Sequence, residues 1–427
     1  MEKKTKKAMG RDFILVVIGQ IISLLGNAVL RFALPLHLLH ITNSPAVFGG
    51  IVALSFLPMF LMSPLGGAAA DRLNKKNIMA CLDFFTAAML LVFLLVYDSV
   101  SLVAAILVVM IFLYGISGFY QPSVQASIPV LVEKEKMVSA NAVINLVSSL
   151  SGLLGPVLGG ICYSVGGLFP ILVFSVLCFF CSAVMELFIH MPVSSQKTEK
   201  GILGTVLGDL KESICFIGKE QKFIGKLTVV LAFFNLVLSA LQIIGTPVLV
   251  TQVLVFHSAD PDRLLGYTEG ALALGGIAGG ILSAVFGEKF SIAKSWKFLM
   301  GACLLLLPTA VALKSGISGE LQYLVLTASC FLIMVLSSMF TVGLMAHIQQ
   351  ITPETLVGKV IAWIYAICTC SQPVGQAMYG VLFETLKGQE WVIFLLAAAG
   401  AGAVALVFRQ SVKAYEKTLR RQELYSF

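Results

Sequence analysis

Charged residues are scarce in this sequence: they make up 12% of its 427 residues, whereas apolar residues make up 58% and the mean hydropathy is +0.95. Soluble globular chains carry about twice that share of charge. The apolar runs together exceed the roughly 20 residues of one membrane-spanning helix many times over. Long segments of alternating polarity, which are typical of membrane barrels, do not occur. The sequence therefore predicts an all-α membrane protein.

Motifs of enzymes and ATP-driven pumps are also lacking. No Gly-x-x-x-x-Gly-Lys loop or His-Glu-x-x-His motif occurs, so neither ATP, nor a metal site, nor another cofactor is expected. Residues 115–118 and 316–319 both match the Gly-x-Ser-Gly pattern of intramembrane serine proteases, with His347 as a candidate base. One copy falls within an apolar run and the other in a turn, so at least one match is accidental. An enzyme is therefore the remote alternative.

The apolar runs predict twelve transmembrane helices, six on each side of a polar interval. They cover residues 13–38, 46–70, 78–97, 101–121, 141–165, 168–190, 224–250, 267–287, 297–313, 321–347, 358–384 and 391–409. The corresponding domains are an N-terminal six-helix bundle at 1–190, a cytoplasmic linker with an amphipathic helix at 191–224, a C-terminal six-helix bundle at 225–410 and a cytoplasmic tail at 411–427. The basic start of the chain is followed by a run too long for a signal peptide, so we expect it to remain as the first span.

The positions of the cations predict the topology. Of the 29 lysines and arginines, only Arg263, Lys314 and Lys387 fall on the side opposite the N-terminus, and Arg31 falls within a span. Cytoplasmic loops carry the excess of cations, so both termini are expected on the cytoplasmic side of the cell membrane. Contact with anionic lipid then accounts for the net charge of +7, and no nucleic-acid partner is expected. The expected partners are the lipid bilayer and a small-molecule substrate, with the chain as a monomer.

The loop after the second span combines small residues with charge. Its marked positions are Gly67, Asp71, Arg72, Lys75 and Lys76. Small residues let a helix end approach its neighbour, and a carboxylate suits the positive N-terminus of another helix. Asn74 tolerates the left-handed backbone of a tight turn. We expect a conformational role, and the alternative is an ordinary cytoplasmic loop.

The fifth span carries Gly155-Pro156-Val157-Leu158-Gly159-Gly160. The proline removes a backbone donor and should bend the helix, while the glycines allow close packing. Residues 275–280 of the eighth span hold Gly276 and Gly280 in two overlapping small-xxx-small pairs, and we predict that these two glycine surfaces pack together. The number of residues that separates Asp71 from Glu288 is the same as the number that separates Pro156 from Pro373. This register favours two pseudo-symmetric halves, the design of alternating-access transporters.

A few ionisable residues fall inside the predicted spans. Arg31 lies in the outer part of the first span and should either face a wet cavity, pair with an acid or reach the headgroups. Gln20, Ser23 and Asn27 precede it at helical spacing and predict one polar stripe leading towards it. The candidates for ion coupling are Asp83, Glu269 and Glu384. Either glutamate could pair with Arg31 and so form a gate. If the substrate is an organic anion, Arg31 would instead be its counter-ion. Asp83 either titrates or pairs with loop cations.

Two of these motifs resemble a known family. The stretch from Gly67 to Lys76 resembles the loop signature of the major facilitator superfamily, and Gly155-Pro-x-x-Gly-Gly resembles its antiporter signature. Residues 19–36 and 128–141 are similar to the branch of macrolide-efflux proteins and enterobactin exporters. The resemblance implies twelve spans and, in most members, export in exchange for protons. Asn27 stands where this branch often has aspartate and Tyr114 where many antiporters have arginine, so the coupling ion is not identified.

The resemblance also implies a cavity lined mainly by the first, fourth, seventh and tenth spans. The candidate cavity residues are Asn27, Arg31, Phe32, Tyr114, Asn235 and Gln242, with Gln372 and Gln376 of the eleventh span as further candidates. A mostly apolar set with a few polar anchors suits amphiphilic organic molecules. The interpretation is a drug, macrolide or siderophore-like exporter driven by the proton gradient. The alternative is a lysophospholipid or solute transporter of different direction or coupling.

Overall fold

The computed structural model describes residues 10–97, 101–133, 136–191, 222–286, 291–353 and 356–425, and every element in these ranges is a helix. Eleven spans in them are long and apolar enough to cross a membrane. The remaining predicted span corresponds to α14 (Val357–Thr385), a continuous helix of 29 residues. The protein is therefore an all-α membrane protein, as predicted. The predicted amphipathic helix within 191–224 lies outside the described residues.

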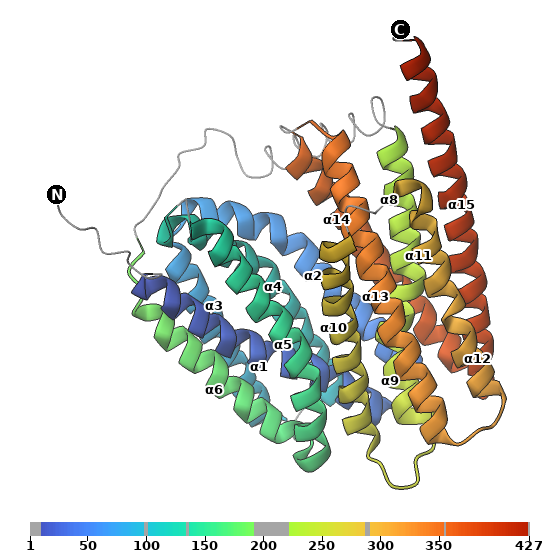
Figure 1. Cartoon of the computed structure of the whole chain (residues 1–427). Coiled ribbons are helices and arrows are strands. Elements are labelled where there is room, and N and C mark those ends of the chain that lie inside the picture. Colours follow the sequence, from blue (N-terminus) through green and yellow to red (C-terminus); the bar gives the residue numbers. More distant parts are fainter. Residues whose placement is uncertain are drawn as a thin grey trace. The chain divides into compact units, whose positions relative to one another are not determined.

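Contacts divide the described chain into two units. The first contains α1 (Arg11–Thr42), most of α2 (Pro45–Arg72), α3 (Lys75–Val96), α4 (Leu102–Leu131), α5 (Met137–Gly166) and α6 (Leu168–Leu187) (Figure 1). In this unit α1 packs against both α5 and α6, and α3 packs along α6. The ends of α1, α3, α4 and α6 share an apolar core that includes Phe13, Met79, Val124 and Ile189.

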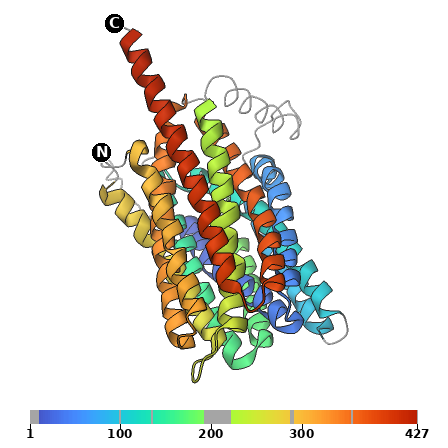
Figure 2. The ribbon, with the colours of Figure 1, turned by 90° about the vertical axis from the view of Figure 1, so that its right-hand side faces the viewer.

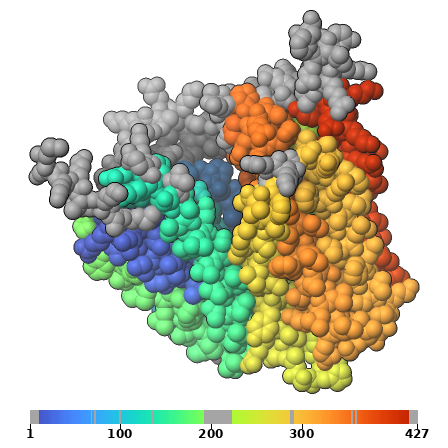
Figure 3. All heavy atoms as spheres, viewed as in Figure 1, coloured from blue at the N-terminus to red at the C-terminus, as the bar shows by residue number. Residues whose placement is uncertain are grey.

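The second unit contains the helices from α8 onward, together with Ser44–Ala53 at the start of α2. Its elements are α8 (Lys222–Phe234), η3 (Asn235–Ser239), α9 (Ala240–Val248), η4 (Leu249–Val253), α10 (Pro261–Phe286), α11 (Ile292–Leu304), α12 (Leu306–Lys314), α13 (Gly319–Ile351), α14 and α15 (Glu390–Tyr425). Helices α10 and α13 lie side by side along their length, as the space-filling view also shows (Figure 3). Whether the predicted domain boundaries delimit independent bundles stays a prediction.

Several spans are interrupted or extended for identifiable reasons. Pro308 has no N–H to bond Leu304, and the span 292–314 breaks there into α11 and α12. The predicted end of the fourth span at residue 121 is wrong, because α4 continues through Pro122 and Pro129 to Leu131. Pro122 leaves the carbonyl of Gly118, and Pro129 that of Gln125, without the usual N–H partner, yet the helix continues past both. Prolines are tolerated inside membrane helices where neighbouring helices and local adjustments compensate for the lost bond.

The last helix is longer than the predicted span at 391–409. Helix α15 runs from Glu390 to Tyr425 without interruption and packs alongside α8 (Figure 2). Near its C-terminal part, the ring of Tyr415 stacks on Phe223 of α8 with centroids 3.8 Å apart. The predicted tail at 411–427 is therefore helical as far as Tyr425.

The turn between α2 and α3 corrects another expectation. Asn74 has φ −69° and ψ 112°, not the left-handed backbone predicted for it. Its side chain instead accepts a hydrogen bond from the backbone N–H of Lys76 at 3.1 Å. Asn74 is thus the N-cap of α3, a role that uses the same short polar side chain to satisfy an unpaired helix donor.

Some of the glycines expected to join α5 and α10 contact another helix of their own unit. A Cβ added at Gly155 would overlap the Cβ of Ala28, and one added at Gly159 would lie 2.8 Å from the Phe32 ring, so the α5 surface fits against α1. The α10 surface fits against α13, where a Cβ at Gly279 would lie 2.7 Å from Ser338 Cβ. Small-xxx-small spacing marks a close contact without specifying the partner. The predicted contact between α5 and α10, which belong to different units, stays a prediction.

Candidate functional site

Arg31 belongs to a small aromatic group within the first unit. Its guanidinium carbon lies 3.8 Å above the ring centroid of Tyr114 on α4, and that ring lies 4.6 Å from the ring of Phe56 on α2. A cation over an aromatic face is stabilised by about 0.5–2 kcal/mol, with more gained where water is excluded. Arg31 Nε and Nη2 are buried and have no hydrogen-bond partner. The group therefore holds a cation with two unused donor atoms, Nε and Nη2.

A second polar cluster lies deeper in the same unit and joins α1, α3, α4 and α6. Gln20 Nε2 donates to Tyr120 Oη at 2.7 Å, and Tyr120 Oη donates to Glu186 Oε1 at 2.8 Å. Ser23 Oγ donates to Asp83 Oδ1 at 3.1 Å. Each of these five residues is at most 5% exposed, and Glu186 is fully buried. Four helices thus bring two carboxyl groups into one buried network, which we call the carboxyl cluster.

The carboxyl cluster is short of hydrogen-bond donors. Gln20 Oε1, Asp83 Oδ2 and Glu186 Oε2 are all buried without a partner, and all three are acceptors. Among the described residues, no cation forms an ion pair with either carboxyl group. A buried polar group without a partner costs about 1–3 kcal/mol, and more when it is charged. Buried acceptors without a partner therefore mark the cluster as a candidate functional site.

The polar stripe predicted along α1 therefore serves two different sites. Gln20 and Ser23 turn towards α3 and α4 in the carboxyl cluster, while Arg31 contacts Tyr114. Asn27, between them in sequence, is only half-buried. The stripe was predicted from spacing on one helix, and only the neighbouring helices decide which group each side chain meets.

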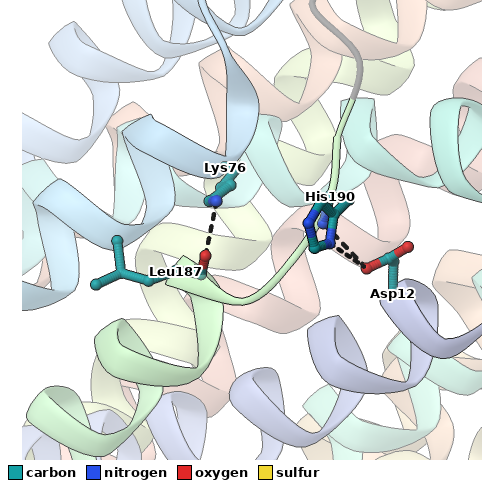
Figure 4. A network of polar contacts seen from close by, with 4 residues as sticks. All are labelled: Asp12, Lys76, Leu187 and His190. Atoms are coloured by element: carbon teal, nitrogen blue, oxygen red, sulfur yellow. Dashed lines mark hydrogen bonds and ion pairs between the residues drawn. The ribbon is translucent and has the colours of Figure 1, made fainter.

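Polar contacts close the end of α6 next to the carboxyl cluster (Figure 4). Lys76 Nζ on α3 donates to the carbonyl of Leu187, the residue after Glu186, at 2.7 Å. The backbone N–H of His190 donates to Asp12 Oδ1 on α1 at 3.0 Å. Both contacts are exposed. They tie the end of α6, where Leu187 directly follows Glu186, to α3 and α1.

The other ion-coupling candidates lie in the second unit. Glu384 is exposed; it accepts a hydrogen bond from Ser44 Oγ at 2.9 Å and one from the backbone N–H of Ala46 at 3.4 Å, so it caps the start of α2. Glu269 is half-buried on α10, beside a pair formed by Thr268 Oγ1 and Thr327 Oγ1 at 3.0 Å. The geometry therefore indicates a structural role for Glu384, and Glu269 remains a candidate for ion coupling.

The predicted polar cavity residues of the second unit differ in their contacts. Asn235 Nδ2 donates to Leu231 O and its Oδ1 accepts from Ser239 Oγ, so this amide is used inside its own π-helical turn. Gln376 on α14 is fully buried, and neither polar atom of its side chain has a partner. Gln242 Nε2 is also buried and unpartnered, whereas Gln372 is half-buried. Gln376 and Gln242 therefore remain the better candidates for contact with a ligand.

The predicted gating residues are described only in part. The side chains of Asp71 and Arg72 lie outside the described residues, Lys75 is 7% exposed, and Lys76 holds the α6 end. Pro156 lies inside α5 and Gly160 is buried, whereas an added Cβ at Gly67 or Gly280 would meet no atom within 4 Å. At Gly276 it would lie 3.7 Å from Met334 Cε. Their conformational role stays a prediction.

Sequence reasoning missed Glu186. Its position near the end of a predicted span is typical of a boundary charge, and no local motif distinguishes it. An acid within an apolar run is itself a functional signal, and this signal was available. Its link to Asp83, Tyr120 and Gln20 was not, because the four residues are far apart in the sequence.

Comparisons with known proteins agree with this architecture. Residues 16–375 match the Major Facilitator Superfamily. The chain is 25% identical over 406 residues to macrolide efflux protein A of Streptococcus pyogenes, covering 91% of this chain and 93% of that protein. It is 28% identical over 162 residues to enterobactin exporter EntS of Citrobacter koseri, covering 36% and 37%. The crystal structure of the nucleoside transporter NupG aligns with a TM-score of 0.74 at 12% identity, covering 95% of this chain and all of that one, which shows the shared fold. Since the family match spans most of the chain, the protein belongs to the Major Facilitator Superfamily and is a membrane transporter.

Proposed function

We propose that this protein is a secondary active transporter that exports a hydrophobic or amphiphilic organic molecule in exchange for protons. It would work by alternating access in the cell membrane, as a monomer with both termini in the cytoplasm. The observation that carries the proposal is the similarity to a macrolide efflux protein along 91% of the chain. The antiporter-like Gly155-Pro-x-x-Gly-Gly sequence supports exchange.

The Arg31 group supports an amphiphilic substrate. The rings of Tyr114 and Phe56 offer apolar surface, and the guanidinium group of Arg31 offers unused donors within the same few ångströms. Ligand sites commonly combine aromatic walls with a small number of polar anchors. Asn27 and Phe32 lie on the same helix as Arg31, which makes α1 the main candidate wall of the cavity.

The unused donors of Arg31 also favour a second candidate function. Guanidinium groups bind carboxylates and phosphates through two parallel hydrogen bonds. A lysophospholipid or another organic anion would satisfy Nε and Nη2 together, and its transport need not be export. This candidate differs from the first in the charge of the substrate and in the direction of movement.

Inside-out membrane vesicles distinguish these functions. Radiolabelled erythromycin is the macrolide probe, a lysophospholipid is the anionic probe, and the pH gradient is imposed with an acidic interior. Accumulation of erythromycin that nigericin abolishes is the expected result, with vesicles lacking the protein as the control. Accumulation of the lysophospholipid alone would replace the first candidate by the second. Accumulation only with the gradient reversed would contradict antiport.

A further inference from the structure

We infer that the carboxyl cluster is a proton-binding site, and that its protonation couples transport to the proton gradient. The cluster consists of Gln20, Ser23, Asp83, Tyr120 and Glu186. The coupling part rests on the proposed function, whereas the proton-binding part does not. The site lies within the first unit and is separate from the Arg31 group.

The balance of donors and acceptors is the first argument. The three unpartnered atoms in the cluster are carbonyl or carboxylate oxygens, so the missing partners are donors. One of these oxygens, Oε1, belongs to Gln20, which is 1% exposed. The shortage of hydrogen-bond donors therefore affects a neutral amide as well as the two acids. Ser182 also lies beside Asp83, but its hydroxyl donates to Gly19 O at 3.1 Å. A proton on either carboxyl group converts an acceptor into a donor and reduces the shortage.

The hydrogen bonds that link Gln20, Tyr120 and Glu186 can be formed with the donors and acceptors in either order. With Glu186 ionised, the amide N–H donates to the tyrosine and the tyrosine donates to the carboxylate, as the distances of 2.7 and 2.8 Å record. With Glu186 protonated, the carboxyl group donates to Tyr120 Oη, and Tyr120 donates to the amide oxygen once the Gln20 amide has turned over. Amide oxygen and nitrogen exchange places without moving the rest of the side chain. The network therefore accommodates a proton without repacking the four helices.

The surroundings of the two carboxyl groups favour a shared proton. Asp83 and Glu186 are close enough to interact electrostatically, and two buried like charges oppose each other. Helices α4 and α5 contain no charged residue. The other charged or titratable groups on the packed elements are Arg11, Asp12, Arg31, His37 and His40 on α1, Lys75 and Lys76 on α3, and His190 after α6. Lys76 bonds a backbone carbonyl and His190 bonds Asp12, and among the described residues no ion pair joins any of these groups to Asp83 or Glu186.

The α6 end provides the route to this site. Leu187, which accepts the hydrogen bond from Lys76, directly follows Glu186, and this contact is exposed. Release of the contact between Lys76 and Leu187 would let water reach Glu186 from the helix end shown in Figure 4. Proton exchange then requires only local opening, which is less costly than separating packed helices.

Infrared difference spectroscopy of the purified full-length protein tests proton binding without any substrate. We expect a carboxylic-acid C=O band that grows as the pH falls across neutrality, disappears or halves in Glu186→Gln, and shifts in frequency in Tyr120→Phe. Glu416→Gln, on α15, is the matched control and should keep the band. Asp83→Asn provides a second variant if Glu186→Gln unfolds. A band that is unchanged in both Glu186→Gln and Asp83→Asn would overturn the inference. Loss of the band at constant pH when Na⁺ replaces K⁺ would also overturn it, in favour of a sodium site.

Transport in proteoliposomes tests the coupling. Glu186→Gln should lose accumulation of erythromycin against its gradient, by at least tenfold, but retain exchange of labelled for unlabelled erythromycin, because exchange needs no net proton movement. Uphill accumulation by Glu186→Gln at the parent rate would overturn the coupling. If the parent protein moves no erythromycin while the infrared band behaves as expected, the proposed substrate fails and the proton site stands. If the parent accumulates erythromycin and no band exists, the proton site fails and the export function stands.

Discussion

Replacing Gly155 with alanine tests the contact between α5 and α1. The added Cβ would overlap Ala28 Cβ and lie 3.0 Å from the main-chain carbon of Ala28. Relaxed carbon–carbon contacts are about 3.5–4.0 Å, so the two helices must separate by roughly 0.5–1 Å or more. Overpacking of this kind costs about 1–3 kcal/mol. The change also relieves the unfavourable helix propensity of glycine, by up to about 1 kcal/mol.

Gly152 is the matched control, because it lies one turn earlier on α5 and an added Cβ there meets no atom within 4 Å. Both substitutions gain the same helix propensity, so the difference between them isolates the packing cost. We expect Gly155→Ala to be less stable than Gly152→Ala by about 1–3 kcal/mol, which is about 5- to 150-fold in the unfolding equilibrium.

The assay is unfolding of the purified protein by SDS in mixed micelles, followed by circular dichroism. Gly155→Ala should unfold at a lower SDS fraction than the parent, and Gly152→Ala at the same or a higher fraction. Equal midpoints for the two variants would refute the close α1–α5 contact. A leucine at Gly155 should disturb folding itself, so loss of transport in that variant would not by itself identify a hinge.

Three further predictions concern the two polar groups. Tyr120→Phe leaves Gln20 Nε2 and Glu186 Oε1 without a partner, so it should lower the free energy of unfolding by about 1–3 kcal/mol in the same SDS assay. Tyr365→Phe, at an exposed position, is the control and should have no such effect; equal effects of the two changes would contradict the buried network. Lys76→Met removes the hydrogen bond to Leu187 O, so backbone hydrogen exchange should become faster at the α6 end and change little elsewhere. Mass spectrometry of peptides measures this exchange, and an unchanged rate would mean that this bond does not hold the helix end. Arg31→Gln removes the unpartnered Nε and Nη2 donors that a substrate would bind, and it should weaken substrate binding by about 10- to 150-fold, measured as the KM of vesicle transport. Transport of every substrate at the parent KM would mean that Arg31 has no contact with substrate.

Local features of the sequence predicted the helices well. Apolar run length predicted the spans because the bilayer fixes the length of a membrane helix. The loop and antiporter signatures predicted the family for a similar reason, since each is contained in one short stretch. Helix ends were less predictable: α4 continues through two prolines and α15 runs to Tyr425, because packing against neighbouring helices decides whether a helix continues.

Relations between helices were not predictable in the same way. Spacing on α5 and α10 identified close-packing glycines, but only the tertiary structure showed that Gly155 and Gly159 contact α1 and that Gly275 and Gly279 contact α13. Spacing on α1 identified Gln20 and Ser23 as polar, but their partners on α3 and α4 assigned them to a different group from Arg31.

The sequence by itself determined that this chain crosses a membrane many times and that it has the signatures of a transporter, because both follow from residues close together in the chain. Only the tertiary structure decided that Asp83 and Glu186 share one buried network. The two acids come from different helices: Glu186 bonds Tyr120, which also accepts from Gln20 on α1, and Asp83 accepts from Ser23 on the same α1. The shortage of donors around them exists only once those helices have packed and excluded water.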